Sequence, residues 1–506
     1  MFASALSASI LGMEVCPIQV EADVSDGLPS FTMVGYPSAQ VKEAQDRVRT
    51  ALRNNHLSLP PKRVTVNFAP ADIKKEGAGF DVPVAAAVLA ASGVLDPALL
   101  QGVMLVGEIS LSGEIHPVPG ILPRVIRARE LGCRYCMVPS ENIKEGKLVK
   151  DMEIIGVRNI EEMVRYLKHP EEFCSPPEKE GEVPEELGVD FREIRGQEGA
   201  RRASEIAVSG FHNILFIGPP GAGKTMLARR IPTIIPQLTF EESLELTKIY
   251  SIAGLLSPAS PLVRQRPFRS PHHTSSPQSI AGGGRIPRPG EVTLAHRGVL
   301  FLDEMPEFSR RSLELLRQPM EDKRIQLSRT GGTFLFPAGF MLVAAMNPCP
   351  CGYYPDMNRC TCTAGQVQHY LGKISNPLLD RIDLCSEVSA VTFEQMSGEE
   401  TGESSATIRK RVERARALQE ERYKNEKICF NGELSGGQIE RYCVMTPEAS
   451  RLIRKAFQKM QFSARAYHRV LKVARTIADM EQMEKIDTAH AAEALSYRAF
   501  DKKYWA

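Results

Sequence analysis

The sequence has 506 residues, more than one hydrophobic core usually supports, so we expect two or three domains. Apolar residues make up 43% and charged residues 25%, and the formal net charge of +2 excludes a strongly basic tail for general nucleic-acid binding. The first residues do not have the pattern of a signal peptide, and the most apolar stretch, Val82–Leu95, is too short to span a bilayer. Eleven cysteines, an odd number, favour reduced thiols. We therefore expect a cytoplasmic protein without a membrane partner.

Residues 1–168 alternate short β-branched runs with helical patterns, which predicts a compact α/β domain. The run Val64–Asn67 is typical of a strand, and Ala39–Arg53 and Phe80–Ala91 are typical of helices. The next segment, 169–189, is rich in proline and acidic residues and has almost no apolar periodicity. We expect it to be an extended linker.

A second α/β unit is predicted over residues 190–395, and it ends at a polar, glycine-containing stretch. The remaining residues, 396–506, have only helical periodicity and are expected to form a helical lid domain. The fold class is therefore α/β with a helical C-terminal part. The predicted C-terminal helices are Ala406–Tyr423, Pro447–Met460, Ala464–Met480 and Asp487–Tyr497.

A phosphate-binding loop is predicted between a buried-strand pattern, Asn213–Ile217, and a helical pattern, Met226–Ile231. Glycines let successive backbone N–H groups point inward and surround phosphate oxygens. Lys224 would neutralise the β- and γ-phosphates of ATP, and the Thr225 hydroxyl would bind Mg²⁺. The predicted nucleotide-binding residues are Gly218, Pro219, Pro220, Gly221, Ala222, Gly223, Lys224 and Thr225.

Two further apolar runs end in polar residues that complete this site. Gly298–Leu302 is followed by Asp303, which would hold Mg²⁺, and by Glu304, which would polarise the attacking water. Phe340–Ala345 leads to Asn347, whose amide would orient the same water and sense the γ-phosphate. The sequence therefore predicts an ATP-hydrolysing site.

Three runs carry a resemblance to a known family: Pro289–Phe308, Phe336–Gly352 and Ser375–Leu384. They resemble the magnesium-chelatase-like AAA+ ATPases and, within that group, the YifB/ComM family. The resemblance extends over nearly the whole chain. It implies a P-loop AAA+ core and a homo-oligomeric ring, expected to be a hexamer, with ATP bound between subunits.

The resemblance places an arginine finger at Arg381, which would act on the γ-phosphate of a neighbouring subunit. A planar guanidinium suits this role because it stabilises charge on the transferring phosphoryl group. The alternative is a salt bridge within the subunit, to Asp380 or Asp383.

Two more positions follow from the resemblance. Arg465, at the start of a predicted C-terminal helix, resembles the second sensor, and Arg469 one turn later is its competitor. Gln197, in an Arg-Gly-Gln run, matches a position that approaches the nucleotide base.

The N-terminal region resembles the protease domain of Lon, along Lys75–Phe80 and Val106–Pro123. By this alignment Gly79 occupies the position of the nucleophilic serine and Leu122 that of the lysine. Neither residue can attack a carbonyl or accept a proton. We therefore expect an inactive, Lon-protease-like domain that serves as a scaffold or binding domain.

Two segments are candidates for contact with a substrate. The stretch Ala253–Pro289 resembles an inserted loop that faces the pore of the ring. A predicted β-hairpin at 323–336 carries Lys323 and Arg329, which could pair with phosphates of a nucleic acid. The alternative for either cation is a solvated surface charge.

Four cysteines near the third run could close tetrahedrally on a structural zinc ion, although their one-residue gaps are tighter than usual. The alternatives are free thiols or a redox-sensitive pair. We expect His272 and His273 to be polar loop residues rather than metal ligands. The candidate zinc ligands are Cys349, Cys351, Cys360 and Cys362.

The function that the resemblance favours is an ATP-driven ring motor on single-stranded or branched DNA, a helicase that promotes branch migration in recombination or DNA uptake. A protein-remodelling ATPase, similar to the motor subunit of magnesium chelatase, is the alternative. A third reading is an ATP-gated scaffold, which would bind ATP without sustained turnover.

Overall fold

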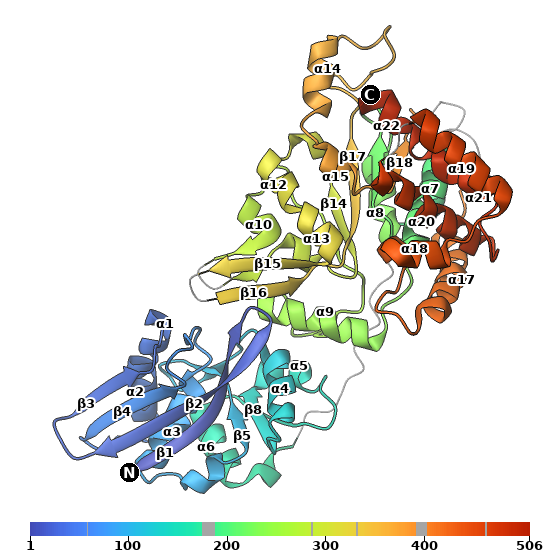
Figure 1. Cartoon of the computed structure of the whole chain (residues 1–506). Coiled ribbons are helices and arrows are strands. Elements are labelled where there is room, and N and C mark those ends of the chain that lie inside the picture. The colour runs from blue at the N-terminus through green and yellow to red at the C-terminus, as the bar shows by residue number, and fades with distance from the viewer. Residues whose placement is uncertain are drawn as a thin grey trace.

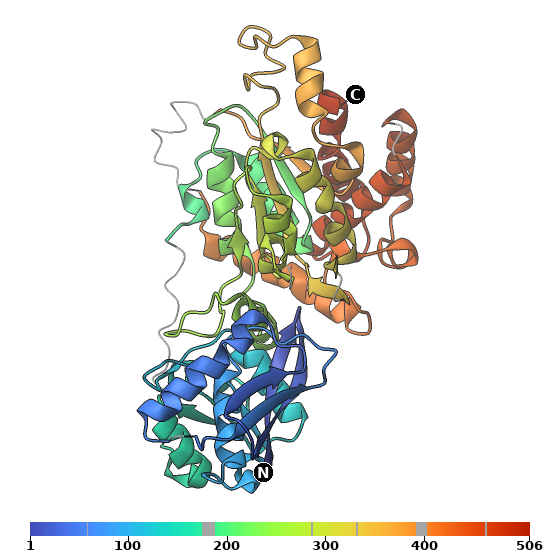
Figure 2. The same cartoon turned by 90° about the vertical axis from the view of Figure 1, so that its left-hand side faces the viewer.

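The computed structural model describes residues 1–506 except 58, 175–187, 285–286, 330–331, 391–401, 461–462 and 506, and omits the side chains of 500–502. Most of the expected linker and the expected boundary at 395–396 lie outside the described residues. An N-terminal α/β region, a central α/β region and a C-terminal helical layer follow one another along the chain (Figure 1). The two ends of the chain lie at opposite ends of the molecule in both views (Figures 1 and 2).

The N-terminal region is built on a seven-stranded mixed sheet in the order β3–β4–β2–β1–β5–β8–β9. The strands are β1 (Phe2–Leu11), β2 (Glu14–Ser25), β3 (Ser30–Val34), β4 (Arg63–Ala69), β5 (Val103–Leu105), β8 (Tyr135–Pro139) and β9 (Glu153–Val157), with a separate pair β6 (Glu108–Ile109) and β7 (Ile115–His116). The helices are α1 (Ala39–Lys42), α2 (Ala44–Asn54), α3 (Asp81–Ala91), α4 (Ile121–Glu130), α5 (Ile143–Gly146) and α6 (Ile160–Lys168).

The single helix predicted over Ala39–Arg53 is interrupted at Glu43. There the amide of Asp46 donates to the carbonyl oxygen of Glu43, at 3.1 Å, so the chain makes a tighter i to i+3 turn. Glu43 keeps right-handed helical dihedral angles, and the two pieces remain a locally bent helical segment.

The central region contains a five-stranded, fully parallel sheet in the order β11–β14–β17–β10–β18. Its strands are β10 (Ile214–Ile217), β11 (Phe268–Arg269), β14 (Val299–Leu302), β17 (Met341–Met346) and β18 (Leu384–Glu387), with short pairs β12 (Gly282–Gly283) and β13 (Arg288–Pro289), and β15 (Arg324–Arg329) and β16 (Gly332–Pro337). Its helices are α7 (Glu198–Gly210), α8 (Lys224–Ile234), α9 (Phe240–Ala253), α10 (Pro277–Ala281), α11 (Glu291–Leu294), α12 (Arg310–Leu315), α13 (Arg317–Asp322), α14 (Ala364–Leu371) and α15 (Asn376–Leu379).

Helices cover both faces of this sheet, which explains its continuous apolar strands. Along β10, Ile214 and Phe216 join the core shared with α7 and α8, whereas Leu215 and Ile217 join the core shared with α12 to α15. The alternation follows from the two-residue period of a strand. Both faces are therefore buried, and polar residues are left for the sheet edges.

The C-terminal helices between residues 405 and 496 extend the first of these two cores, because their apolar residues pack with those of α7 and α8, whereas Tyr504 and Trp505 of the last helix pack in the second core. Four of them match the predicted helices closely, whereas α18 and α22 were not predicted. The first turn of α18 contains Gly436 and Gly437, which have poor helix propensity, and Ser435 and Gln438 cap it instead. The helices are α17 (Ser405–Tyr423), α18 (Gly436–Tyr442), α19 (Pro447–Met460), α20 (Ala464–Met480), α21 (Thr488–Ser496) and α22 (Ala499–Trp505).

The N-terminal region contacts the central region through α9 and the β15–β16 hairpin. Met13, in the turn between β1 and β2, packs against apolar residues of both elements. Helix α4 packs on α9, and the hydroxyl of Ser251 donates to Glu145 at 2.5 Å. Across the residues that the structure describes, no helix is both long and apolar enough to cross a membrane.

Candidate functional site

The predicted nucleotide-site residues come together at the carboxyl-terminal edge of the central sheet. The phosphate loop follows β10, Asp303 and Glu304 follow β14, and Asn347 follows β17, which lies between β10 and β14. Open parallel sheets bind ligands in the crevice outside the carboxyl ends of their strands. The topology thus places the three predicted motifs around one site.

Glycines shape the backbone of the phosphate loop. Gly221 and Gly223 have φ angles of 74° and 90°, and a Cβ on Gly218 would lie 2.0 Å from the carbonyl oxygen of Val388. Helix α8 begins immediately after Gly223, which has no side chain that could cap the helix N-terminus. Its first amides are therefore available to an anion.

Lys224 is buried at the start of α8 and directs its ammonium group into the loop. It donates to the carbonyl oxygens of Gly218 (2.7 Å) and Pro219 (2.8 Å) and to Oδ1 of Asn347 (3.0 Å). Burial lowers the pKa of Lys224 to about 8, although the two acids after β14 act in the opposite direction. A phosphate could replace these neutral carbonyl partners and would place a full negative charge beside the ammonium group of Lys224.

The two predicted magnesium ligands are in direct contact, because the Thr225 hydroxyl donates to Oδ2 of Asp303 at 2.8 Å. A hydroxyl and a carboxylate are hard oxygen ligands of the kind that Mg²⁺ prefers. Glu304 is exposed at a left-handed backbone position with φ 50°. His273 lies 3.9 Å from its carboxylate, a contact not predicted, although His273 closely follows β11 at the same sheet edge.

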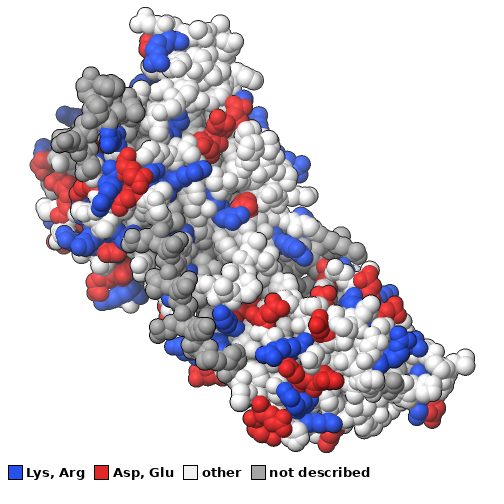
Figure 3. Space-filling model, turned by 180° about the vertical axis from the view of Figure 1, so that it is seen from behind, with Lys and Arg blue, Asp and Glu red and all other residues white. Residues whose placement is uncertain are grey.

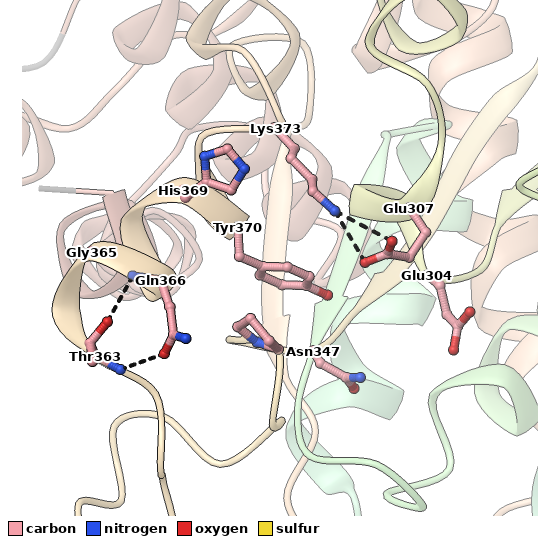
Figure 4. Close-up of a pocket in the computed structure, with 10 residues that line it drawn as sticks. Glu304, Glu307, Asn347, Thr363, Gly365, Gln366, His369, Tyr370 and Lys373 are labelled. Atoms are coloured by element: carbon pink, nitrogen blue, oxygen red, sulfur yellow. Dashed lines mark hydrogen bonds and ion pairs between the residues drawn. The ribbon is translucent and has the colours of Figure 1, made fainter.

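A cavity of 700 Å³ opens beside Glu304 and Asn347 (Figure 4). Helix α14 and the residues after it form another wall, where Lys373 pairs with Glu307 at 3.3 Å. Burial and the nearby carboxylates raise the pKa of Tyr370, which also lines the cavity. The cavity is large enough to admit a side chain of another molecule next to Glu304.

Gln197 borders the phosphate loop from the N-terminal end of α7. It has a left-handed backbone, with φ 58°, and its amide donates to the carbonyl oxygens of Ser389 and, at 3.5 Å, Ala222. Gln197 thus lies next to the phosphate loop, and its proximity to a nucleotide base stays a prediction.

The two predicted arginines lie together at the opposite, amino-terminal edge of the sheet. Arg381 precedes β18, and the side chain of Asn213, which precedes the parallel β10, donates to its carbonyl oxygen at 2.8 Å. The guanidinium of Arg381 pairs with Glu321, and Arg465 lies 4.0 Å from the same carboxylate. The ion pair considered for Arg381 thus exists, but its partner is Glu321 rather than Asp380 or Asp383.

The two candidates for the second sensor, Arg465 and Arg469, have different environments in the structure. Arg469 is buried, lies 3.6 Å from Asp383, and donates to the carbonyl oxygens of Leu379 (3.4 Å) and Ile382 (3.5 Å). The side chain of Arg465 remains 59% exposed. Arg469 is therefore engaged in packing α20 against the sheet edge, whereas Arg465 can reach another molecule.

The predicted hairpin is present as β15 and β16, but its two cations differ. Arg329 is exposed near the tip and donates to the carbonyl oxygen of Ser328 at 2.9 Å. Lys323 instead ends α13, is partly buried and lines a cavity of 160 Å³, where burial lowers its pKa. Only Arg329 therefore remains a candidate for contact with phosphates of a substrate.

The four cysteines form one compact group directly after β17. Their sulfur atoms all lie within 4.8 Å of one another, and three of the sulfur–sulfur distances are 3.3 Å for Cys349–Cys351, 3.5 Å for Cys351–Cys360 and 3.8 Å for Cys349–Cys360. None of the eleven cysteines, all of which lie among the described residues, forms a disulfide.

In the N-terminal region, the two positions aligned with the protease residues lie in a packed environment. A Cβ on Gly79 would contact Val106 at 3.4 Å, and Leu122 is buried with its amide donating to Glu145 at 2.8 Å. Nearby, the buried Arg124 donates to three backbone carbonyl oxygens. Gly79 and Leu122 therefore contribute to packing and backbone hydrogen bonding, and neither supplies a nucleophile or a base.

Comparison with known families accounts for most of the chain. Residues 190–396 match the family "Magnesium chelatase, subunit ChlI", residues 20–142 match "Subunit ChlI of Mg-chelatase", and residues 402–498 match "Magnesium chelatase, subunit ChlI C-terminal". Lon protease 2 of Bacillus subtilis is 27% identical over 127 residues, covering 25% of this chain and 22% of that protein.

Several relatives match over nearly their full lengths, among them the following two. The protein YifB of Salmonella typhimurium is 43% identical over 493 residues, covering 97% of this chain and 96% of the relative. Competence protein ComM of Haemophilus influenzae is 42% identical over 499 residues, again covering 97% and 96%. Family membership implies ATPase activity with ATP and Mg²⁺, and the lysine, threonine and acid contacts described above fit these ligands. The chain belongs to the YifB/ComM family of magnesium-chelatase-like AAA+ ATPases.

Proposed function

We propose that the chain is a ring-forming motor that hydrolyses ATP between subunits and acts on single-stranded or branched DNA, promoting branch migration in recombination or DNA uptake. The observation that best supports a ring is that the predicted catalytic residues lie at two opposite edges of one sheet. The DNA substrate is supported by the relative named competence protein and by the exposed hairpin.

The separation of the two edges argues for catalysis between subunits. The phosphate loop follows Ile217, whereas Arg381 precedes Leu384, which pairs with Ile214 at the other end of the strand. Four strand residues span about 13 Å, and Arg381 is engaged with Glu321 on the far side. Arg381 therefore acts on ATP bound to a neighbouring copy, with Arg465 beside it, and the cavity next to Glu304 would receive them. A closed ring, which we propose is a hexamer, satisfies every such interface.

Each remaining residue has a role at the carboxyl-terminal edge. Lys224 and the loop amides bind the phosphates, Thr225 and Asp303 hold Mg²⁺, and Mg²⁺ neutralises charge on the phosphates when bound. Glu304 orients and polarises the attacking water, and Asn347 fixes the same water from β17. Hydrolysis and release would then change the contacts between neighbouring subunits and move the β15–β16 hairpin.

The charge distribution restricts how DNA could bind. On the face seen in Figure 3, Lys and Arg side chains alternate with Asp and Glu among the described residues. Contacts therefore have to come from particular segments, and exposed Arg329 near the hairpin tip is the candidate. We expect Arg329→Ala to weaken DNA binding and to reduce its salt dependence by about one counterion, with Arg454→Ala as an exposed control.

A protein substrate is the second candidate. It is favoured by the three magnesium chelatase families that together match most of the chain, and by the mixed surface charge. In this case the same ring would rearrange a protein partner, and turnover would not depend on DNA.

The ATPase rate with and without branched DNA separates these functions. We would compare the wild type with Glu304→Gln and with Glu448→Gln, a surface control on α19 with a 58% exposed side chain. We expect DNA to stimulate the wild type and the control, and Glu304→Gln to lose at least about 100-fold in rate while still binding ATP. Turnover that is indifferent to DNA would contradict the DNA motor and favour the protein substrate. Nucleotide binding without turnover in the wild type would point to a scaffold.

A further inference from the structure

We propose that Cys349, Cys351, Cys360 and Cys362 bind one zinc ion, and that this ion braces the phosphate loop by holding the turn at Gly352 against Pro220. The proposal rests on the nucleotide site described above but not on DNA as the substrate.

The sulfur positions fit a single tetrahedral ion. A zinc–sulfur bond of about 2.3 Å separates sulfur atoms by about 3.8 Å in a tetrahedron. The sulfur–sulfur distances of 3.3, 3.5 and 3.8 Å, with all pairs within 4.8 Å, need only small adjustments to reach this geometry. A cluster of several irons would hold its cysteines farther apart, because more than one metal lies between them. Four protein ligands close the coordination shell, as in structural rather than catalytic zinc sites.

Backbone contacts around Cys349 support a metal-bound thiolate. Its sulfur accepts hydrogen bonds from the amides of Gly352 (3.2 Å) and Tyr354 (3.4 Å), and Cys349 itself is fully buried. Donors around a thiolate stabilise its charge and orient it toward a metal. Gly352 has φ 87°, a left-handed conformation that glycine adopts readily, and this bend brings the amides to the sulfur.

The same turn is pressed against the phosphate loop. A Cβ on Gly352 would lie only 2.4 Å from Cδ and 2.7 Å from Cγ of Pro220. Pro220 belongs to the segment that surrounds the phosphates, so the position of this turn limits how far the loop can move outward. The zinc-bound turn would therefore favour the loop conformation that binds nucleotide.

The cysteine segment also joins two other walls of the site. Cys349 is two residues beyond Asn347, which accepts from Lys224 at 3.0 Å. Cys362 immediately precedes Thr363, the capping residue of α14, whose hydrogen bonds with Gln366 are drawn in Figure 4. One ion would thus fix the end of β17, the start of α14 and the turn on Pro220 relative to one another.

The test measures metal and nucleotide binding in the full-length, reduced protein. We expect about one zinc per chain in the wild type and in Cys174→Ser, an exposed-cysteine control, and loss of zinc in Cys360→Ser. We expect the dissociation constant of a fluorescent ADP analogue to rise about tenfold in Cys360→Ser. Gly352→Ala should keep its zinc and still bind the analogue more weakly, because the added methyl group displaces Pro220.

Folded, reduced wild type without zinc would overturn the proposal, as would iron in place of zinc. Loss of zinc from Cys360→Ser with unchanged ADP affinity would overturn the bracing of the loop. If Cys360→Ser does not fold, Cys360→His provides a replacement ligand, and zinc removal from the wild type by a chelator gives the same comparison of ADP affinity. None of these outcomes depends on DNA stimulation, so they leave the proposed motor function to its own test.

Discussion

Helices α4 and α8 begin with nearly the same local structure but have different consequences. Each follows a left-handed glycine, with φ and ψ of 79° and 32° at Gly120 and 90° and 13° at Gly223. Each also carries a buried cation that donates to backbone carbonyl oxygens, Arg124 in α4 and Lys224 in α8. The glycine-led helix and its cation therefore do not by themselves make a nucleotide site.

The difference lies in what occupies the first turn. The carboxylate of Glu145 accepts from the amide of Leu122 and closes the start of α4, and Ser251 of α9 binds the same oxygen. Among the described residues no carboxylate closes the first turn of α8 in this way, and Thr225 instead donates to Asp303 beside it. A nucleotide site is possible at the N-terminus of α8, the open end, because its first amides are free to bind an anion and acidic residues follow a neighbouring strand. The N-terminus of α4, the closed end, instead connects the N-terminal and central regions through Glu145 and Ser251.

The largest effect is expected at the closed end, from Arg124→Met. This change leaves the carbonyl oxygens of Ala8, Pro119 and Gly120 without their donor. Since each unsatisfied buried group costs about 1–3 kcal/mol, the free energy of unfolding should fall by about 4 kcal/mol. Denaturant unfolding measures it, with Arg127→Met as the control, because that side chain on the same helix is 38% exposed. Nucleotide affinity should stay unchanged. If Arg124→Met lowered both the free energy of unfolding and the nucleotide affinity, the two helix ends would be coupled.

At the open end, Lys224→Met should mainly affect binding. The change removes the cation that faces the phosphates, so we expect the affinity for MgATP to fall at least about 100-fold, or about 2.7 kcal/mol. The unfolding transition of the nucleotide-free protein should persist, because two of the three partners of Lys224, at Pro219 and Asn347, are only partly buried and can be reached by water. Titration with a fluorescent nucleotide checks this, and Arg229→Met, an exposed position on α8, should bind normally. Equal affinity in both variants would contradict the role of Lys224.

These two helix ends also show what the sequence could predict. The strand, glycine loop and helix around Lys224 were predictable because their spacing is local, and Asp303 and Asn347 followed because parallel strands present their carboxyl ends at one edge. The partners of Arg381 and Arg465 were not, since Glu321 comes from a different helix, and only packing brings the three together. The same holds for the closure of α4, because Glu145 and Ser251 are distant in sequence from Gly120.

Opening the end of α4 should have a smaller effect. Glu145→Ala removes the acceptor of the Leu122 amide and of the Ser251 hydroxyl, so we expect a loss of about 2 kcal/mol in the free energy of unfolding. Glu145→Gln keeps an oxygen acceptor and should lose about half as much. Glu141→Ala, an exposed position just before α5, serves as the control. If the unfolding curves of Glu145→Ala and Glu141→Ala coincide, the carboxylate does not stabilise this helix end.

The smallest expected effect is the pH dependence of nucleotide binding. In the free protein the pKa of Lys224 is about 8, and bound phosphates favour its charged form, so binding above pH 8 requires uptake of a proton. The affinity for MgATP should therefore fall by up to about tenfold, or 1.4 kcal/mol, from pH 8 to pH 9. Lys224→Arg should show little change over this range because a guanidinium stays protonated. Arg124, with a pKa of about 10, should leave the stability of the N-terminal region nearly constant between pH 7 and 9. If the wild-type affinity for MgATP does not change between pH 8 and pH 9, the charges of Asp303 and Glu304 offset the effect of burial on the pKa of Lys224. Lys224 would then already be protonated in the nucleotide-free protein over this pH range.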